Sequence, residues 1–449
     1  MIKFGTDGVR GIANKDLTPE DAFSIGRATG YVLGKRTGKK TKVLIGKDTR
    51  ISSNMLEAAL VAGICSVGAE AYIAGVIPTP AIATMVKKYE YNLGIMISAS
   101  HNPVPDNGIK IFNCDGYKLA DEVEEQIIQA IYHGAEDIPR PTGKDIGTYY
   151  HSDSIEQDYI QSLKATVGNM RLDGIKIGLD CANGATYSVA PKIFEELGAT
   201  VHAMHNQPNG ININENCGST HMDSLVECVT KNGLDIGIAF DGDGDRCLVV
   251  DSKGHILCGD QIMSIVANHL KDQGALAKNT LVTTIMSNIG MDQMGKKHDI
   301  NVVRTTVGDR YVLEQMLANG YNFGGEQSGH FIFLDHTTTG DGILAALQLL
   351  KVMVDKKQDM ASINQYITMH PQITMNAYVH RDKKDSYKEN PAIKAAVDVA
   401  TKKYEGTGRV LVRASGTEAM VRVTLEGENL DQITETATEL KNLIESELS

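Results

Sequence analysis

The sequence lacks the features of several large protein classes. Its seven cysteines are an odd number and include no C-x-x-C pair, which argues against a disulfide framework and against a cysteine-rich zinc site. It has no basic run and a formal charge of -12, which disfavours a nucleic-acid partner because such binding relies on a basic surface. The absence of low-complexity tracts and of long blocks of like charge argues against disorder.

A targeting signal and a long apolar run are also missing. The N-terminal stretch MIKFGTDGVRG has no apolar signal region. The most apolar helical stretch, residues 60–69, meets Glu70 well before it reaches membrane-spanning length. We therefore expect a cytoplasmic protein without a membrane partner. Because the net charge is -12, a few individually placed cationic side chains would have to bind any anionic ligand.

With 449 residues, 42% of them hydrophobic and 22% charged, the chain has a globular composition and is too long for one ordinary core. Three stretches, starting at Lys42, Ile175 and Thr280, share one plan: an apolar strand, a polar loop, an amphipathic helix and a second strand. This plan suits crossover units in a largely parallel sheet and indicates a three-fold internal repeat. Loops at the carboxyl ends of such strands can face a common cleft.

The C-terminal part has a different character. After Pro371 it contains alternating runs, including ITMNAYVHR and RVLVRAS, and ends in an acidic helix. We therefore predict an α/β fold of three similar α/β domains with mixed, largely parallel sheets around a cleft, plus a smaller C-terminal α+β domain. Polar stretches and stretches rich in proline and glycine place the domains at residues 1–150, 151–254, 255–368 and 369–449.

The segment DGDGDR, residues 241–246, directly follows the apolar strand LDIGIAF. Three carboxylates at alternate positions repel one another unless a cation lies among them, and the intervening glycines let Asp241, Asp243 and Asp245 converge. Oxygen ligands suit Mg²⁺ or Ca²⁺. A calcium EF-hand is excluded, because its loop needs Gly and Glu where this chain has Arg246 and Ser252. The remaining alternative is a solvated acidic turn.

Ser100 also follows a strand-like run, in ISASHNPVPDNGIK, so its hydroxyl is expected at the edge of a sheet. It could be a turn residue, a hydrolase nucleophile or a phosphoryl carrier. The absence of a G-x-S-x-G elbow weakens the hydrolase interpretation. An oxygen-only metal site favours phosphoryl transfer, which needs a cation on the migrating group. His101 and Lys110 could act as proton donor, base or phosphate partner, or be structural.

Two further loops offer ligand-binding groups. In GGEQSGH, residues 324–330, Glu326 and Ser328 would point the same way in an extended loop and suit sugar hydroxyls, although the motif taken alone also fits a polar turn. RASGTE, residues 413–418, offers guanidinium, hydroxyl and backbone donors for a phosphate, and Arg422 lies beyond it. Neither G-x-x-x-x-G-K-[ST] nor G-x-G-x-x-G occurs, so a common nucleotide site is unsupported.

In this order, the motifs resemble those of the α-D-phosphohexomutase family, and within it the members that act on glucosamine phosphates. The resemblance runs along the whole chain and rests on FGTDGVRG, GKDTRISS, SASHNPVPDNGIK, DCANGA, NENCGSTH, DGDGDR, VGDRYV, GGEQSGH, TTGDG and RASGTE. It implies that Ser100 carries the phosphoryl group as a phosphoserine. It also implies that Asp241, Asp243 and Asp245, together with Ser100, hold Mg²⁺.

The resemblance assigns the remaining site residues as well. The expected substrate-binding residues are Arg246, Glu326, Ser328, His330, Arg413, Ser415, Gly416, Thr417 and Arg422. Arg10, Lys110 and His101 are expected to assist proton transfer or to stabilise charge beside Ser100. Family members usually have proline where this chain has Ala414 and Ala419, which predicts a freer phosphate loop.

The implied reaction is the interconversion of glucosamine 6-phosphate and glucosamine 1-phosphate through a bound 1,6-bisphosphate. It would supply amino-sugar metabolism, on the route to UDP-N-acetylglucosamine and peptidoglycan precursors. Two alternatives stay open at this point. One is a mutase for glucose, mannose or N-acetylglucosamine phosphates. The other is a non-catalytic phosphosugar sensor, and the intact Ser100 and aspartate triad argue against it. The partner expected is the small phosphosugar itself, and a homodimer is one oligomeric state compatible with the sequence.

Overall fold

The computed structural model describes residues 2–5, 7–34, 40–134, 136–415 and 418–449. By their internal contacts these residues form two compact units. The first consists of Met1–Ile285 with Val303–Asn364, and the second of Met286–Val302 with Gln365–Ser449.

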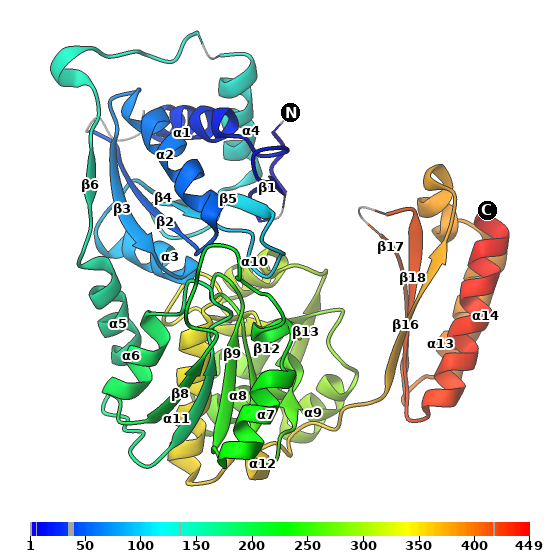
Figure 1. The fold of residues 1–449 in the computed structure, drawn as a ribbon. Coiled ribbons are helices and arrows are strands. Elements are labelled where there is room, and N and C mark those ends of the chain that lie inside the picture. Colours follow the sequence, from blue (N-terminus) through cyan, green and yellow to red (C-terminus); the bar gives the residue numbers. More distant parts are fainter. Residues whose placement is uncertain (1, 6, 35–39, 135, 416–417) are drawn as a thin grey trace. The chain divides into compact units, whose positions relative to one another are not determined.

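The first unit begins with a six-stranded mixed sheet of order β1-β5-β4-β2-β3-β6 (Figure 1). Its strands are β1 (Val9–Ile12), β2 (Lys42–Lys47), β3 (Glu70–Val76), β4 (Leu93–Ile97), β5 (Asp106–Asn113) and β6 (Tyr149–His151). Strand β4, LGIMI, is buried at every position, as expected for a central strand that is covered on both faces. It runs parallel to β2 and antiparallel to β5, so the chain reverses in the loop that holds Ser100.

Helices cover this sheet: α1 (Pro19–Gly34), α2 (Ile51–Cys65), α3 (Thr79–Lys88) and α4 (Asp121–Tyr132). Helices α1 and α2 pack closely because of two glycines. A Cβ at Gly26 would lie 2.5 Å from the carbonyl oxygen of Leu60, and a Cβ at Gly63 would lie 2.2 Å from that of Phe23. Neither distance is tolerable for a side chain, so glycine is required at both positions.

A second sheet, of order β11-β10-β9-β7-β8, follows in the same unit. Its strands are β7 (Lys176–Asp180), β8 (Thr200–Met204), β9 (Ile236–Phe240), β10 (Cys247–Asp251) and β11 (Ile256–Leu257). Strands β8, β7 and β9 are parallel, whereas β10 and β11 are antiparallel to their neighbours. The helical segment η1 (Gly143–Asp145) still precedes β6 of the first sheet. The second sheet is accompanied by α5 (Ile155–Ala165), α6 (Val189–Glu196), η2 (Gly218–Thr220) and α7 (Asp223–Asn232).

The third sheet has the order β13-β12-β14-β15. Its strands are β12 (Thr280–Thr284), β13 (Asn301–Thr305), β14 (Phe323–Gly325) and β15 (Phe331–Phe333). The neighbouring helical segments are α8 (Gly259–Asp272), η3 (Ala277–Asn279), α10 (Asp309–Asn319), α11 (Gly342–Lys356) and α12 (Met360–Ile363). Helix α11 is largely buried, and the Asp341 side chain caps its N-terminus by accepting a hydrogen bond from the Leu344 N–H.

The second unit contains an antiparallel sheet of order β16-β18-β17. Its elements are β16 (Gln372–Tyr378), η4 (Arg381–Lys388), α13 (Pro391–Lys403), β17 (Arg409–Ala414), β18 (Met420–Glu426) and α14 (Leu430–Leu448), together with α9 (Gly290–His298). Helix α14 lies along one face of this sheet (Figure 1), and Ile433, Ala437 and Leu440 pack with Val421 and Val423 in the core.

These elements confirm the predicted fold class of three α/β domains and a C-terminal α+β domain. Each of the three expected strand–helix–strand stretches is present, as β2-α2-β3, β7-α6-β8 and β12-α9-β13. The four domain boundaries given above stay predictions. All seven cysteines are among the described residues and are free thiols. Over the part of the chain that the structure describes, no helix is long and apolar enough to cross a membrane.

Candidate active site

Ser100 lies in the loop between β4 and β5 and is only 1% exposed. Its backbone adopts φ +53°, a left-handed conformation that is unfavourable for a serine and has to be held by its surroundings. The Ser100 N–H donates a hydrogen bond to the Ser98 hydroxyl at 3.0 Å. The Ser100 hydroxyl donates to Asp241 Oδ2 at 2.6 Å and lies 3.3 Å from His101 Nδ1. The strained backbone therefore presents this hydroxyl to the aspartate loop of the second sheet.

A buried arginine holds the Ser100 loop from behind. The Arg50 guanidinium donates hydrogen bonds to three carbonyl oxygens, those of Ser100 at 3.1 Å, Asn102 at 2.8 Å and Pro103 at 2.6 Å. Its Nε donates to Asp48 Oδ2 at 2.9 Å, and both side chains of this ion pair are fully buried. The sequence motif GKDTRISS contains both residues, but the sequence alone gave no reason to place them beside Ser100.

Asp48 and Asn214 complete this support. Asp48 also accepts hydrogen bonds from the hydroxyls of Ser98, at 2.7 Å, and Ser53, at 2.9 Å. Asn214, which follows β8 in the chain, donates from Nδ2 to the carbonyl oxygen of Ser100 at 2.9 Å. The Ser100 carbonyl is thus held by side chains from two sides.

The three aspartates of DGDGDR lie in the tight loop between β9 and β10, as the sequence predicts. All three are buried, and one oxygen of each lies within 4.8 Å of the others. Among the residues that the structure describes, Asp243 Oδ1 and Asp245 Oδ1 have no hydrogen-bond partner although both atoms are buried. Buried carboxylate oxygens without donors are costly, so the donor set fits a hard cation that prefers oxygen.

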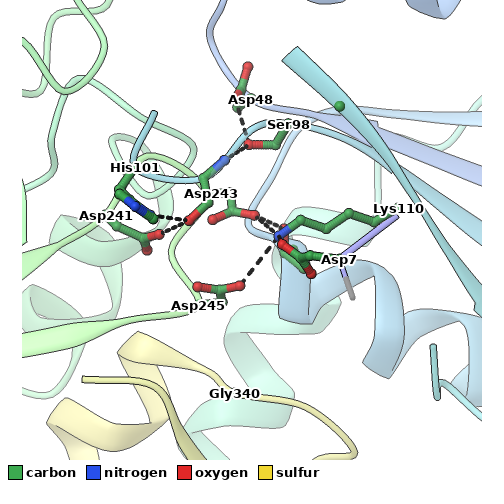
Figure 2. A network of polar contacts seen from close by, with 12 residues as sticks. Asp7, Asp48, Ser98, His101, Lys110, Asp241, Asp243, Asp245 and Gly340 are labelled. Atoms are coloured by element: carbon green, nitrogen blue, oxygen red, sulfur yellow. Dashed lines mark hydrogen bonds and ion pairs between the residues drawn. The ribbon is translucent and has the colours of Figure 1, made fainter. Parts of the chain in front are cut away.

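Lys110, on β5, points into this acidic cluster (Figure 2). Its Nζ lies 2.7 Å from Asp243, 3.2 Å from Asp7 and 3.4 Å from Asp245. Lys110 is 1% exposed. Burial alone would lower the pKa of its ammonium group, but the carboxylates of Asp243, Asp7 and Asp245 raise that pKa well above its usual value. Lys110 is therefore a fixed positive charge at this site.

Asp7 connects two more basic groups to the site. It forms ion pairs with Arg10 and, at 2.6 Å, with Lys118. Lys118 in turn contacts Asp309 at 2.7 Å. Burial opposes ionisation of Asp7, yet Lys110, Lys118 and Arg10 hold its pKa well below the usual range. Asp7 lies in FGTDGVRG and Asp309 in VGDRYV, but the sequence does not show that these two residues and Lys118 form ion pairs, because the three lie on segments far apart in the chain.

His101 is half-buried beside Ser100. Burial, together with the positive charges of Arg246 and Arg10, lowers the pKa of its imidazole to about 4. His101 is therefore neutral at physiological pH and could accept a proton.

GGEQSGH forms a polar turn, the alternative that the motif taken alone also fits, and not an extended loop. The chain turns tightly between β14 and β15, because the Glu326 N–H donates to the His330 carbonyl at 2.9 Å and the Gly329 N–H donates to the Glu326 carbonyl at 3.0 Å. The turn satisfies backbone groups that an extended loop would leave unpaired. The Glu326 carboxylate accepts from the Gly308 N–H at 3.2 Å. The buried Ser328 hydroxyl has no hydrogen-bond partner in the described part of the chain.

His330 lies between two carboxylates, with Nδ1 3.6 Å from Asp245 and Nε2 3.5 Å from Asp309. Burial disfavours its charged form, but the two carboxylates raise the pKa of His330 to about 9. The Gly340 N–H donates to Nε2 at 3.1 Å, a hydrogen bond that forms only while Nε2 carries no proton, so it opposes the charged form that the two carboxylates favour.

A cavity of about 490 Å³ opens beside these groups. Six predicted residues line it: Ser100, Arg10, Asp245, Arg246, Glu326 and His330. Asp7, Lys118 and Asp309 line it as well. The cavity thus combines a buried hydroxyl with cationic side chains and hydrogen-bonding groups, which suits an anionic, polyhydroxylated ligand.

The predicted phosphate loop belongs to the second unit. Arg413 on β17 stands opposite Arg422 on β18 in the sheet register. Burial and the neighbouring Arg422 lower the pKa of Arg413, and within the residues described its Nε is buried without a hydrogen bond. Ser415 Oγ accepts from the Glu418 N–H at 3.2 Å. Gly416 and Thr417 lie outside the described residues. Two adjacent guanidinium groups of this kind favour binding of an anion.

Comparison with known proteins agrees with this arrangement. Sequence profiles of Phosphoglucomutase/phosphomannomutase match in order along the chain: alpha/beta/alpha domain I at residues 1–137, domain II at 157–254, domain III at 258–369 and the C-terminal domain at 375–443. A phosphoglucosamine mutase of Clostridium botulinum (strain Loch Maree / Type A3) is 52% identical over 446 residues, which cover 99% of each chain.

Two solved structures share the fold. A phosphoglucomutase/phosphomannomutase family protein of Burkholderia thailandensis has a TM-score of 0.81 at 21% identity and covers 99% of this chain and 98% of its own. An N-acetylphosphoglucosamine mutase of Aspergillus fumigatus, in complex with GlcNAc-6P and magnesium, has a TM-score of 0.68 at 17% identity, covering 100% and 96%. The resemblance inferred from the motifs is confirmed, and the chain belongs to the phosphoglucomutase/phosphomannomutase family of α-D-phosphohexomutases.

Proposed function

We propose that this chain interconverts glucosamine 6-phosphate and glucosamine 1-phosphate. The observation that carries the proposal is the Ser100 hydroxyl, held in a strained backbone 2.6 Å from the aspartate triad, at a cavity lined by cationic groups. Relatives about half identical over the full chain and named phosphoglucosamine mutase support the choice of sugar.

The proposed reaction has two phosphoryl transfers. Phosphorylated Ser100 first gives its phosphoryl group to the C1 hydroxyl of glucosamine 6-phosphate. The Oγ–P bond breaks and a bond from O1 to phosphorus forms, while the O1 proton leaves to a base and the leaving Oγ takes up a proton. The bound 1,6-bisphosphate then turns around. Ser100 Oγ then gives up its proton and attacks the phosphoryl group at O6. The bond from O6 to phosphorus breaks, phosphoserine is regenerated, and O6 takes up a proton as glucosamine 1-phosphate leaves. No phosphate or proton is consumed overall.

The residues around Ser100 suit these steps. His101 is neutral and 3.3 Å from the hydroxyl, so it can take or return the proton of the reacting oxygen. Arg10 lines the cavity beside Ser100, where its cation would stabilise charge on the migrating group. Lys110 remains protonated within the acidic cluster and offsets its charge. Burial of Ser100 limits hydrolysis of the phosphoserine by water.

The metal proposed for the triad is Mg²⁺. Asp241, Asp243 and Asp245 would hold it, with an oxygen on Ser100 as a further ligand. Two buried carboxylate oxygens that accept no hydrogen bond among the described residues, Asp243 Oδ1 and Asp245 Oδ1, support this. When bound, Mg²⁺ would neutralise negative charge on the transferring phosphoryl group.

The substrate contacts follow from the remaining motifs. Arg246, Glu326 and His330 line the cavity and would bind the sugar together with Ser328. In the second unit, Arg413, Ser415, Gly416, Thr417 and Arg422 would bind the phosphate that is not reacting. Arg413 and Arg422, side by side, supply the charge for this contact.

A turnover assay tests the function. The purified protein should interconvert the two glucosamine phosphates faster than the corresponding phosphates of glucose, mannose or N-acetylglucosamine, and intact-mass and peptide analysis should locate one phosphate on Ser100. Ser100→Ala should abolish both turnover and phosphorylation, whereas Ser98→Ala should leave the phosphate in place. Faster turnover of another sugar phosphate would show that the proposed substrate is wrong. Binding of these phosphates without any turnover would indicate a non-catalytic phosphosugar sensor. The route to UDP-N-acetylglucosamine, the cytoplasmic location and a homodimer stay predictions.

A further inference from the structure

A second group of possible metal ligands lies at the edge of the second sheet. Asp180 ends β7, His205 follows the end of β8, and Cys217 directly precedes η2. The three side chains come from segments up to 37 residues apart, yet one ligand atom of each lies within 4.8 Å of the others. Ligand atoms around a four-coordinate zinc ion lie roughly 3–4 Å apart, given bonds of about 2.0–2.3 Å.

We propose that Asp180, His205 and Cys217 form a structural zinc site, separate from the aspartate triad. One carboxylate, one imidazole and one thiol make a mixed O, N and S donor set, which suits Zn²⁺ and not Mg²⁺ or Ca²⁺. Asp180 and Cys217 are fully buried, whereas the His205 side chain is 28% exposed. The exposed side leaves room for water as a fourth ligand.

Two backbone hydrogen bonds hold the carboxylate of Asp180 in position before any metal ion binds. Its Oδ1 accepts a hydrogen bond from the Ala182 N–H at 2.9 Å, and its Oδ2 accepts one from the Gly218 N–H at 2.9 Å. Backbone donors of this kind orient a ligating carboxylate and leave it a lone pair for a cation. The Gly218 N–H also ties the Asp180 side chain to the segment that carries Cys217.

The imidazole of His205 is also held in place, by the carboxylate of Asp180. His205 has φ +47°, a left-handed conformation that is uncommon for a residue other than glycine and has to be held by its surroundings. Its Nδ1 lies 3.0 Å from Asp180 Oδ2, and this contact raises the pKa of His205. A cation at the site would therefore have to displace the proton that Nδ1 shares with Asp180. Burial raises the pKa of the Cys217 thiol to about 12, so a cation has to displace its proton.

An ion at this position would stabilise the support of Ser100. The Asn214 N–H donates to the Ala182 carbonyl at 2.9 Å, and the Asn214 side chain donates to the Ser100 carbonyl at 2.9 Å. Zinc would thus join the segments around Asp180 and Cys217, between which Asn214 is held. Its role would be to stabilise the fold and not to take part in phosphoryl transfer.

Titration with Co²⁺ tests the site in the full-length protein. The protein is first stripped of metal with a chelator and then saturated with Mg²⁺, so that the triad is occupied. We expect one equivalent of Co²⁺ to produce a near-ultraviolet absorption band from thiolate sulfur to cobalt, which the sulfur-free triad cannot give. Zn²⁺ should displace the Co²⁺ and remove the band. Absence of the band in the wild-type protein at saturating Co²⁺ would overturn the proposal.

Variants identify the ligands. Cys217→Ser should abolish the band, whereas Cys228→Ser, a change of another thiol in the same domain, should leave it intact. His205→Asn, which suits the left-handed backbone, should weaken Co²⁺ binding at least about tenfold. Zinc should also raise the melting temperature of the wild-type and Cys228→Ser proteins only. A band that survives in a folded Cys217→Ser protein would place the sulfur elsewhere and refute the site.

Discussion

Arg50 Nη2 lies 3.1 Å from the carbonyl oxygen of Ser100, so a fully buried guanidinium holds the residue proposed to carry the phosphoryl group. The same guanidinium holds the carbonyls of Asn102 and Pro103. A lysine cannot form the same set of hydrogen bonds, because its ammonium group has a single nitrogen whereas the guanidinium group donates from several nitrogens in one plane.

We predict that Arg50→Lys lowers kcat by about 10²-fold while leaving KM nearly unchanged, because misplacing a reacting group slows chemistry and Arg50 does not line the cavity. Steady-state kinetics and urea unfolding would measure both effects. Arg27→Lys is the matched control, since Arg27 is also buried and donates to a carbonyl, that of Ile138, away from Ser100. Equal losses of kcat in both variants would mean that Arg50 contributes only to stability.

Asp243→Asn should remove the Mg²⁺ dependence of turnover together with most of the activity, because the charge of the triad offsets the cost of dehydrating the ion. Activity measured against Mg²⁺ concentration checks this. Asp251→Asn is the control: Asp251 is a buried aspartate at the end of β10 and accepts from the backbone N–H groups of Lys253 and His255. If Asp243→Asn kept the wild-type rate and the wild-type dependence of activity on Mg²⁺ concentration, the assignment of the metal site would be wrong.

Arg413→Ala should raise KM for both monophosphates by roughly 10- to 100-fold, since a hydrogen bond to a charged group contributes about 1.5–3 kcal/mol. Removing one of two adjacent guanidinium groups should leave phosphorylation of Ser100 and Mg²⁺ affinity unchanged. Kinetics in both directions and a metal titration would test this. Lys441→Ala, which removes an ion-paired cation on α14, serves as control. Unaltered KM in both directions would show that the loop is only a turn.

Asp341 predicts a defined pH dependence of stability. Burial raises the pKa of this carboxyl, which accepts hydrogen bonds from the Tyr159 hydroxyl and the Leu344 N–H, from 3.8 to about 6. Between these values the folded state holds the proton more strongly than the unfolded state. The contribution of Asp341 to stability therefore falls as the pH rises from about 4 to 6, by on the order of 2–3 kcal/mol, and is constant above.

Asp341→Asn keeps an oxygen acceptor but cannot ionise, so it should be more stable than the wild type at pH 7 and about equally stable at pH 4. Asp359→Asn should show the opposite trend. Asp359 caps α12 from an exposed position, and its bonds from Ser362 lower its pKa, so its charge stabilises the fold above the usual pKa of an aspartate. Chemical denaturation at both pH values measures the difference. A pH-independent effect of Asp341→Asn would contradict the assignment.

The fold class and the position of most site residues in the fold follow from patterns in the residues alone. Apolar runs such as LGIMI can be satisfied only inside a covered sheet, and polar residues directly after such strands must lie at the edge of the sheet. Ser100 and the aspartate triad were predicted on this ground, and the order of the motifs gave the family.

Which groups meet at the site depends on contacts between distant segments of the chain. Arg50, Asp7, Lys118, Asp309 and Asn214 contact the site from segments distant in sequence, and nothing in their local pattern identifies a partner. For the same reason the residue pattern left two alternatives at Glu326, an extended loop and a polar turn, of which the turn is present. Its backbone groups pair with His330 in an antiparallel hairpin, and strand pairing is a long-range property that local residue spacing does not contain.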